Sequence, residues 1–204
     1  PGTIKNFLNA DLFCYANVPY RIKDYEELLK DPHNTIDFDE ELDALIDQRV
    51  EAVGADGRLI WDKNDSVYTV NLTEKLLAAV LAKLSNFIPE AGIWMNTQRP
   101  EWNDANNALV GYGVSMVTLY YTRRYQQYLL NLFSEVEFDQ VEISTELVEL
   151  LNSINSTFVD NRHLLEGKIS DTDRRLILDR LGRAADSFRA GLYSHGFAGG
   201  RVAV

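Results

Sequence analysis

The stretch LLAAVLAKL at residues 76–84 constrains the fold most, because it would be apolar on almost every side of a helix. Asn71 before it is a preferred N-cap residue, and Glu74 stands where a capping box requires it. Pro89 and Gly92 then end the segment. We therefore expect a helix over about 72–88 that other elements cover on both sides.

A second long segment, about 106–133, has the same character. It is apolar through VSMVTLYY and polar only near its end. It also contains Gly111 and Gly113, each of which costs on the order of 1 kcal/mol inside a helix. We expect a second doubly buried helix here, with another backbone or a ligand close to the two glycines.

The remaining helical patterns have one polar face each. Short or amphipathic helices are expected over 23–30, 38–52, 145–165 and 171–192, the last capped by Ser170 with Asp173. A small hairpin is expected from 59–61 and 67–70 across the turn at 62–66. The contrast between the two kinds of helix predicts a mainly α fold with an inner and an outer layer.

Composition excludes several classes of function. A net charge of −11 over 204 residues argues against nucleic-acid binding, which needs a basic surface. No apolar run is long enough to cross a bilayer, so no membrane role is expected. Cys14 is alone, which rules out an internal disulfide and favours a buried structural thiol. These features leave the compartment open and favour the cytoplasm.

Neither a metal nor a cofactor is indicated. His33, His163 and His195 are widely separated and lack ligand spacing, so no zinc site is expected. The acidic run at 37–41 has Leu42 where a calcium loop needs glycine, so it is interpreted as a solvated helix start. No phosphate-binding or dinucleotide-binding fingerprint is present.

The segment IWMNTQRPEWNDANNALVG, from residue 93 to residue 111, is the candidate functional site. Indole rings suit the flat CH faces of sugars, and amide and charged side chains suit their hydroxyl rims. Long ordered connections between helices are usually functional. The substrate-binding residues expected here are Trp94, Asn96, Gln98, Arg99, Trp102, Asn103, Asn106 and Asn107. The alternative is that the rings fill the core and the amides cap the next helix.

Glu101 and Asp104 are the candidate catalytic residues. Their spacing of three places both carboxylates on one face of a turn or helix. A carboxyl that burial or a neighbouring charge keeps protonated can serve as a general acid. The alternative is that Asp104 caps the following helix, in which case backbone N–H groups would favour its ionised form.

The segment RPEWNDANNALVG resembles the catalytic-loop region of carbohydrate-active proteins built on an (α/α)6 barrel. The W-N-D at 102–104 is similar to the D-W-N-D-G segment of cellobiose phosphorylase-like enzymes. The resemblance implies that Asp104 is the general acid and that Trp102 shapes the sugar site. Glu101 and Ala105 depart from the Asp and Gly of that segment. Similar segments in long bacterial proteins favour the interpretation of this chain as a fragment.

We therefore expect a single helical domain over 1–204, or a fragment of a larger (α/α) barrel domain. The expected function is cleavage of glycosidic bonds by hydrolysis or phosphorolysis, with a carbohydrate substrate and no cofactor. The alternative is a non-catalytic sugar-binding or structural helical domain. Two doubly apolar helices also predict association, either with the remaining part of a longer polypeptide or with another copy.

Overall fold

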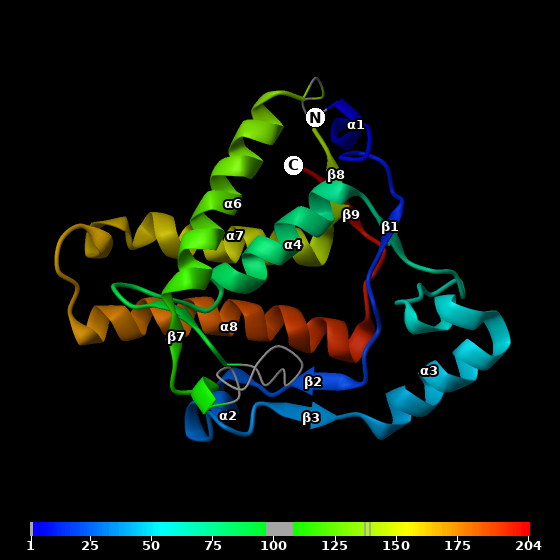
Figure 1. Cartoon of the computed structure of the whole chain (residues 1–204), viewed down its shortest axis with the longest axis horizontal. Coiled ribbons are helices and arrows are strands. Elements are labelled where there is room, and N and C mark those ends of the chain that lie inside the picture. The colour runs from blue at the N-terminus through cyan, green and yellow to red at the C-terminus, as the bar shows by residue number, and fades with distance from the viewer. Residues whose placement is uncertain (1, 97–107, 137, 139) are drawn as a thin grey trace.

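The computed structural model describes residues 2–96, 108–136, 138 and 140–204, and the chain is mainly α-helical, as expected (Figure 1). The helices are α1 (Gly2–Lys5), α2 (Tyr25–Lys30), α3 (Glu40–Val53), α4 (Leu72–Leu84), α6 (Met116–Ser134), α7 (Thr145–Asp160) and α8 (Asp171–His195). Two short 3-10 helices, η1 (Gly54–Arg58) and η2 (Arg162–Leu165), extend α3 and α7.

The strands are short and all their pairings are antiparallel. They are β1 (Phe13–Cys14) with β4 (Thr69–Val70), β2 (Tyr20–Ile22) with β3 (Ile36–Phe38), β8 (Glu142–Ser144) with β9 (Arg201–Ala203), and the three-stranded β5 (Phe87–Ile88), β6 (Gly92–Trp94) and β7 (Val114–Ser115). Most of these pairs join segments far apart in the sequence. The predicted hairpin is present as a single bridge between Trp61 and Val67, whereas Thr69–Val70 pairs with β1 instead.

The predicted starts of α4 and α8 are confirmed by their caps. The Asn71 side chain accepts a hydrogen bond from the Glu74 backbone N–H at 2.9 Å. Ser170 accepts one from the Asp173 N–H at 3.1 Å. Asp39 accepts from the Leu42 N–H, so this member of the acidic run at 37–41 caps α3. Each bond satisfies a donor that the first helical turn leaves without a partner.

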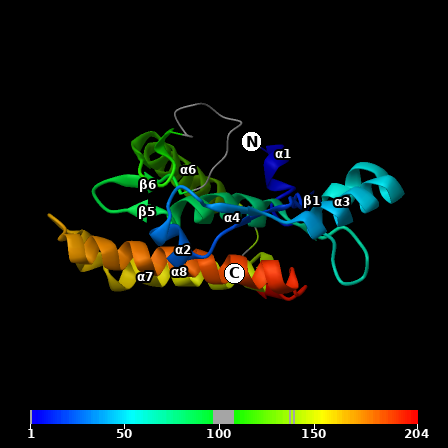
Figure 2. The ribbon, with the colours of Figure 1, turned by 90° about the horizontal axis from the view of Figure 1, so that it is seen from below.

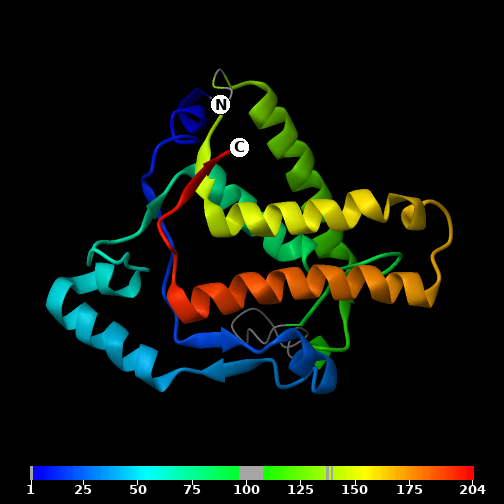
Figure 3. The same cartoon turned by 180° about the vertical axis from the view of Figure 1, so that it is seen from behind.

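α4 lies between two layers of helix. α6 covers one side of it, and α7 covers the other, with α8 packed beside α7 (Figures 2 and 3). Apolar residues of α4, α6, α7 and α8 form one core, which includes Val80, Leu81, Leu129, Leu147, Ile154, Ile177 and Leu181. α4 is therefore covered on two sides, as expected, although a strip of Ala79, Ala82 and Lys83 remains exposed.

The second apolar segment does not form the expected inner helix. α6 begins at Met116, where Ser115 accepts a hydrogen bond from the Thr118 N–H, and β7 precedes it. The backbone at Gly111 has φ +80°, which an α-helix does not allow. α6 buries Thr122, Leu129 and Leu132, of which Leu129 belongs to the core shared with α4, and much of its opposite side is open to solvent. The prediction of a doubly buried helix was wrong because it counted the tyrosines as apolar, although tyrosine tolerates an exposed position.

A close contact fixes α2 against α8. The Tyr25 ring is buried and its hydroxyl donates to Asp179 Oδ1 at 2.8 Å. Gly182 of α8 faces that ring, and a Cβ there would lie 2.2 Å from the ring carbon Cε2 of Tyr25. Glycine is therefore required for this ring to reach its partner. Burial, followed by the bond to Asp179, raises the pKa of Tyr25 above its usual value.

Candidate functional site

The two described ends of the segment from 93 to 113 lie beside each other in one small sheet. In β6 and β7, Ile93 is the register partner of Ser115, and Trp94 is that of Val114. Beyond the strands, the Met95 N–H donates to the Gly113 carbonyl at 3.0 Å, and the Gly111 N–H donates to the Met95 carbonyl at 2.6 Å. Backbone bonds therefore join the two ends of the segment, and strands flank it where we expected a long connection from one helix to the next.

Two of the expected substrate-binding residues lie at this base. The Trp94 indole N–H donates to the Gly111 carbonyl at 2.9 Å, and the ring is partly exposed. Asn96 is 7% exposed, and its amide nitrogen donates to the Asn86 side-chain oxygen at 2.6 Å. Both polar groups therefore serve the loop base, while the Trp94 ring keeps some surface for a ligand.

The other expected site residues lie outside the described residues. These are Gln98, Arg99, Glu101, Trp102, Asn103, Asp104, Asn106 and Asn107. Their roles, including that of Asp104 as an acid, stay predictions from the sequence.

The two glycines after the loop mark close backbone approaches, as expected. A Cβ on Gly111 would lie 2.0 Å from the Pro32 carbonyl oxygen, and its positive φ already disfavours other residues. A Cβ on Gly113 would lie 2.8 Å from the Leu109 Cβ. The Tyr112 ring between them contacts the His33 ring edge-on, with centroids 4.5 Å apart. The loop base thus rests on the segment that follows α2.

The turn between β5 and β6 is held by an arginine of α8. Arg174 donates from Nε to the Pro89 carbonyl and from Nη2 to the Glu90 carboxylate, both at 3.0 Å. Its Nη1 pairs with Asp171. Glu90 has φ 58°, a conformation rare for a residue other than glycine. Arg174 therefore fixes the sheet of β5, β6 and β7 to α8. The residues just before β7 contact the segment after α2, which gives a second point of attachment.

A buried polar cluster around Glu74 is the strongest feature that the sequence did not indicate. The Glu74 carboxylate is fully buried and accepts from the Ser144 N–H at 2.8 Å and from Arg201 Nη1 at 3.0 Å. It also accepts from the hydroxyls of Ser144 and Tyr15. We had expected this side chain to complete a capping box, but it instead joins β8 and β9 to α4.

Aromatic rings stack beside this cluster. Phe197 lies between Tyr15 and Tyr68, with centroid distances of 5.4 and 4.6 Å and nearly parallel planes. Lys75 Nζ lies 4.0 Å from the Tyr15 centroid, and Arg201 lies over Tyr68 at 5.5 Å. Cations at both ends of a stack are favourable because ring faces are electronegative. Burial, and next the Glu74 charge, hold the pKa of Tyr15 well above its usual value.

The cluster of Glu74, Tyr15, Ser144 and Arg201, hereafter the clasp, connects residues near the two ends of the chain to α4. Its carboxylate already accepts from several donors, and its guanidinium is already paired with Glu74 and Asp11. The polar pocket of about 300 Å³ beside it is lined in part by Tyr68, Phe197 and Arg201. Groups committed in this way stabilise the fold and have little capacity left for proton transfer.

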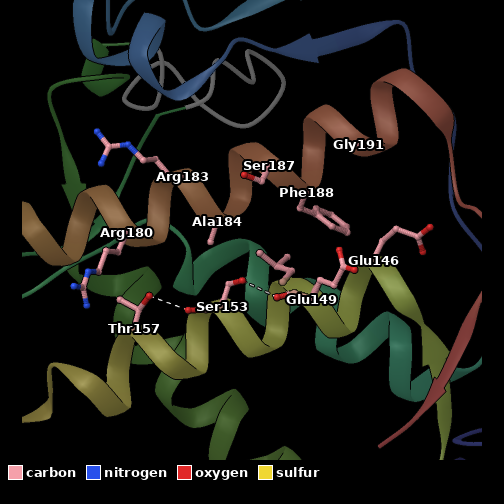
Figure 4. A pocket seen from close by; sticks show the side chains of 11 residues that line it. Glu146, Glu149, Ser153, Thr157, Arg180, Arg183, Ala184, Ser187, Phe188 and Gly191 are labelled. Atoms are coloured by element: carbon pink, nitrogen blue, oxygen red, sulfur yellow. Dashed lines mark hydrogen bonds between the residues drawn. The ribbon is translucent and has the colours of Figure 1, made fainter.

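A groove of about 480 Å³ runs between α7 and α8 (Figure 4). Two of its hydroxyls bond within their own helix, Ser153 to the Glu149 carbonyl and Thr157 to the Ser153 carbonyl. Carboxylates lie toward one end of the groove and guanidinium groups toward the other (Glu146 and Glu149; Arg180 and Arg183). Arg183 is paired with Glu26 at 3.0 Å. The groove therefore has an acidic end and a basic end, and the pairing of Arg183 with Glu26 already engages one of its basic groups.

Within the described ranges, no group of three or more His, Cys, Asp and Glu side chains is arranged to hold a metal ion. No helix in the part of the chain that the structure describes has both the length and the apolar character needed to cross a membrane. Cys14 of β1 is half-buried, whereas we expected it to be fully buried.

The residues around Trp94 and Gly111, at the base of the 93–113 segment, remain the candidate site. No protein-family model matches the sequence, and a search of curated proteins finds no match for it.

Proposed function

We propose that the chain is all or part of a carbohydrate-active protein that cleaves glycosidic bonds, with Asp104 as the general acid. The observation that carries the proposal is the sequence W-N-D at 102–104 within a segment rich in indole, amide and carboxylate groups. Sugar recognition needs these groups together, because a ring offers apolar faces and a polar rim at once.

The described base of the loop supports this proposal. Backbone bonds from Met95 and Gly111 close the loop, and Arg174 fixes the neighbouring turn. A catalytic group must be held to within a fraction of an ångström of its working position, which needs such rigid support. The partly exposed ring of Trp94 lies on the same base and offers a surface for a sugar.

Two chemistries are compatible with one acid. An inverting hydrolase needs a second carboxylate about 6.5–9.5 Å from the acid to activate water. Glu101 is close to Asp104 in sequence, so we assign it to positioning or to tuning the acid rather than to the opposite face. A phosphorylase needs a cationic site for phosphate instead, and Arg99 is the basic residue of the loop.

The same proposal extends to the fold. We propose that the layers made by α6, α4 and α7 with α8 are part of a larger (α/α) barrel, whose catalytic loops lie at one end of the helices. The support is that α4 is covered by helices on both sides, as an inner helix of such a barrel is. The rest of the barrel would come from further polypeptide.

A non-catalytic helical domain is the second candidate. It is favoured by one observation: the Trp94 and Asn96 polar groups bond to the protein itself, at Gly111 and Asn86. If the remaining loop residues do the same, the segment is structural.

Titration of the chain with oligosaccharides by calorimetry separates the candidates. Saturable binding that Trp102→Ala abolishes supports a sugar site, whereas no binding to any glycan supports a structural domain. Product analysis with and without inorganic phosphate then distinguishes the chemistries. A free reducing sugar indicates hydrolysis, and a sugar phosphate indicates phosphorolysis. Binding without either product supports a sugar-binding domain.

A further inference from the structure

α6 presents two adjacent stripes along its length, and one of them is uncovered. The stripe that includes Thr122, Leu129 and Leu132 is buried, and through Leu129 it joins the core shared with α4. The other follows helical spacing and consists of Val117, Tyr120, Tyr121, Arg124 and Tyr128, hereafter the tyrosine stripe. Val117, Tyr120 and Tyr121 are 66, 62 and 63% exposed. Isolated exposed apolar residues are ordinary, but a continuous stripe of them usually marks an interface.

The composition of the tyrosine stripe is that of a protein-binding surface. Tyrosine and arginine are enriched at the centres of interfaces, while aspartate and glutamate are depleted there. From residue 109 to residue 134 the only charged side chains are Arg123 and Arg124, in a chain whose net charge is −11. The Arg124 guanidinium lies over the Tyr121 ring at 5.6 Å. α6 is therefore a locally positive, aromatic surface on an acidic protein, and an acidic partner complements it.

α3 supplies the complementary surface. It carries five carboxylates against the single guanidinium of Arg49. Among the described elements, η1 is the only one that it contacts extensively, so α3 projects from the body as an arm (Figure 1). Its exposed side carries small or apolar residues between acidic ones: Glu41, Ala44, Leu45, Gln48, Glu51 and Ala52. Small side chains leave room for tyrosine rings, and Glu41 and Glu51 make this side of α3 acidic.

The two surfaces have compatible lengths and positions. The tyrosine stripe extends about 16 Å, and α3 about 21 Å, at 1.5 Å per residue. α3 and α6 both lie on the side of the molecule away from α7 and α8 (Figure 2). Two copies that meet through this side can each place their α3 on the α6 of the other. Such a reciprocal exchange closes with two-fold symmetry and forms the contact twice.

We propose that the protein self-associates into a dimer in which α3 of each copy docks on the tyrosine stripe of the other. Tyrosine rings pack between the alanines and Leu45 of α3, and the two arginines of α6 face the acidic side chains of α3. The proposal does not depend on the carbohydrate function.

Sedimentation velocity of the 204-residue chain over a range of concentrations tests the dimer. The expected result is a monomer–dimer equilibrium whose dissociation constant rises with salt, because opposite charges contribute to the contact. A chain that remains monomeric at every concentration would overturn the proposal. Addition of an oligosaccharide is a second arm: a dimer that the sugar dissociates, and that re-forms when the sugar is removed, would show that glycan and not α3 is the preferred occupant of the stripe and would overturn the proposal.

Charge exchange tests the partner surface. Arg123→Glu with Arg124→Glu, and separately Glu41→Lys with Glu51→Lys, should each weaken dimerisation on the order of tenfold, because like charges then face each other. A variant that carries all four substitutions should dimerise again, because opposite charges face each other once more. A matched control for the arginine pair is Arg162→Glu with Lys168→Glu, near the turn between α7 and α8, which changes the net charge by the same amount and should leave the dimer intact. Equal weakening by the control, or no rescue in the combined variant, would overturn the assignment of α3 as the docking element.

Discussion

Glu74 and Arg201 form an ion pair of 3.0 Å in which the Glu74 side chain is fully buried and the Arg201 side chain is 20% exposed. They come from α4 and β9, 127 positions apart in the sequence. A buried carboxylate is stable only when donors replace its water, and here the backbone and hydroxyl of Ser144 add to the arginine. The clasp therefore ties the C-terminal strand to the centre of the helical core.

Replacing Glu74 by glutamine should destabilise the protein strongly. The amide keeps the shape of the side chain but removes the charge that Arg201 and the Ser144 N–H need, so we expect a loss of about 3 kcal/mol in unfolding free energy. Urea denaturation measures it. Glu149→Gln, a change of the same kind at an exposed position of α7, should alter the stability by less than about 0.5 kcal/mol. Equal losses in the two variants would show that the clasp adds nothing.

The local features of the fold were predictable, and the long-range ones were not. Asn71 and Ser170 mark helix starts because a cap bond joins residues only three apart. The partners of β1 and β8 lie far away, and strands of two or three residues carry too short a pattern to identify them. The role of Glu74 was missed for the same reason, since its position suits a capping box and only the folded chain brings Ser144 and Arg201 to it.

The loop base illustrates a different limit. Gly111 and Gly113 were correctly interpreted as close approaches, since glycine inside an apolar segment needs a reason. The same glycines also end the helical pattern, and Ser115 restarts it, so the extent of α6 was overestimated. Periodicity alone could not separate these cases, because Val114 and Val117 suit a strand and a helix equally well.

Gly111→Ala should weaken the loop base. The new Cβ would collide with the Pro32 carbonyl at 2.0 Å, and φ +80° disfavours alanine by itself, so we expect a loss on the order of 2 kcal/mol. The matched control is Gly191→Ala in α8, where nothing lies within 4 Å of the new Cβ. Alanine there should stabilise the helix by up to about 1 kcal/mol. Thermal melting of both variants checks the opposite signs, and two shifts in the same direction would contradict the geometry.

Asp39 should make stability depend on acid. The Leu42 N–H, and next the Arg21 guanidinium, hold the pKa of the Asp39 carboxyl below its usual value. Because the folded pKa is lower than the unfolded value of about 3.9, the stabilisation is fully present above that value and is lost as pH falls through the folded pKa. Asp39→Asn keeps an N-cap but has no charge. The difference in Tm between the two proteins should be greatest near about pH 7 and shrink below about pH 3. A difference independent of pH would exclude the carboxylate as its source.

Asp104→Asn should remove the proton donor and keep nearly the same shape. If the protein cleaves glycosidic bonds as proposed, turnover should fall by about a hundred- to ten-thousandfold, the usual contribution of general acid catalysis. The loss should be smallest for a substrate with an activated leaving group, which needs little protonation. Glu101→Gln, as the matched control in the same loop, should reduce turnover less. If Asp104 only caps the next helix, asparagine is nearly as good a cap, and activity and Tm should both stay unchanged. Measuring both variants on an activated and an unactivated substrate decides between these roles, because only an acid gives a loss that depends on the leaving group.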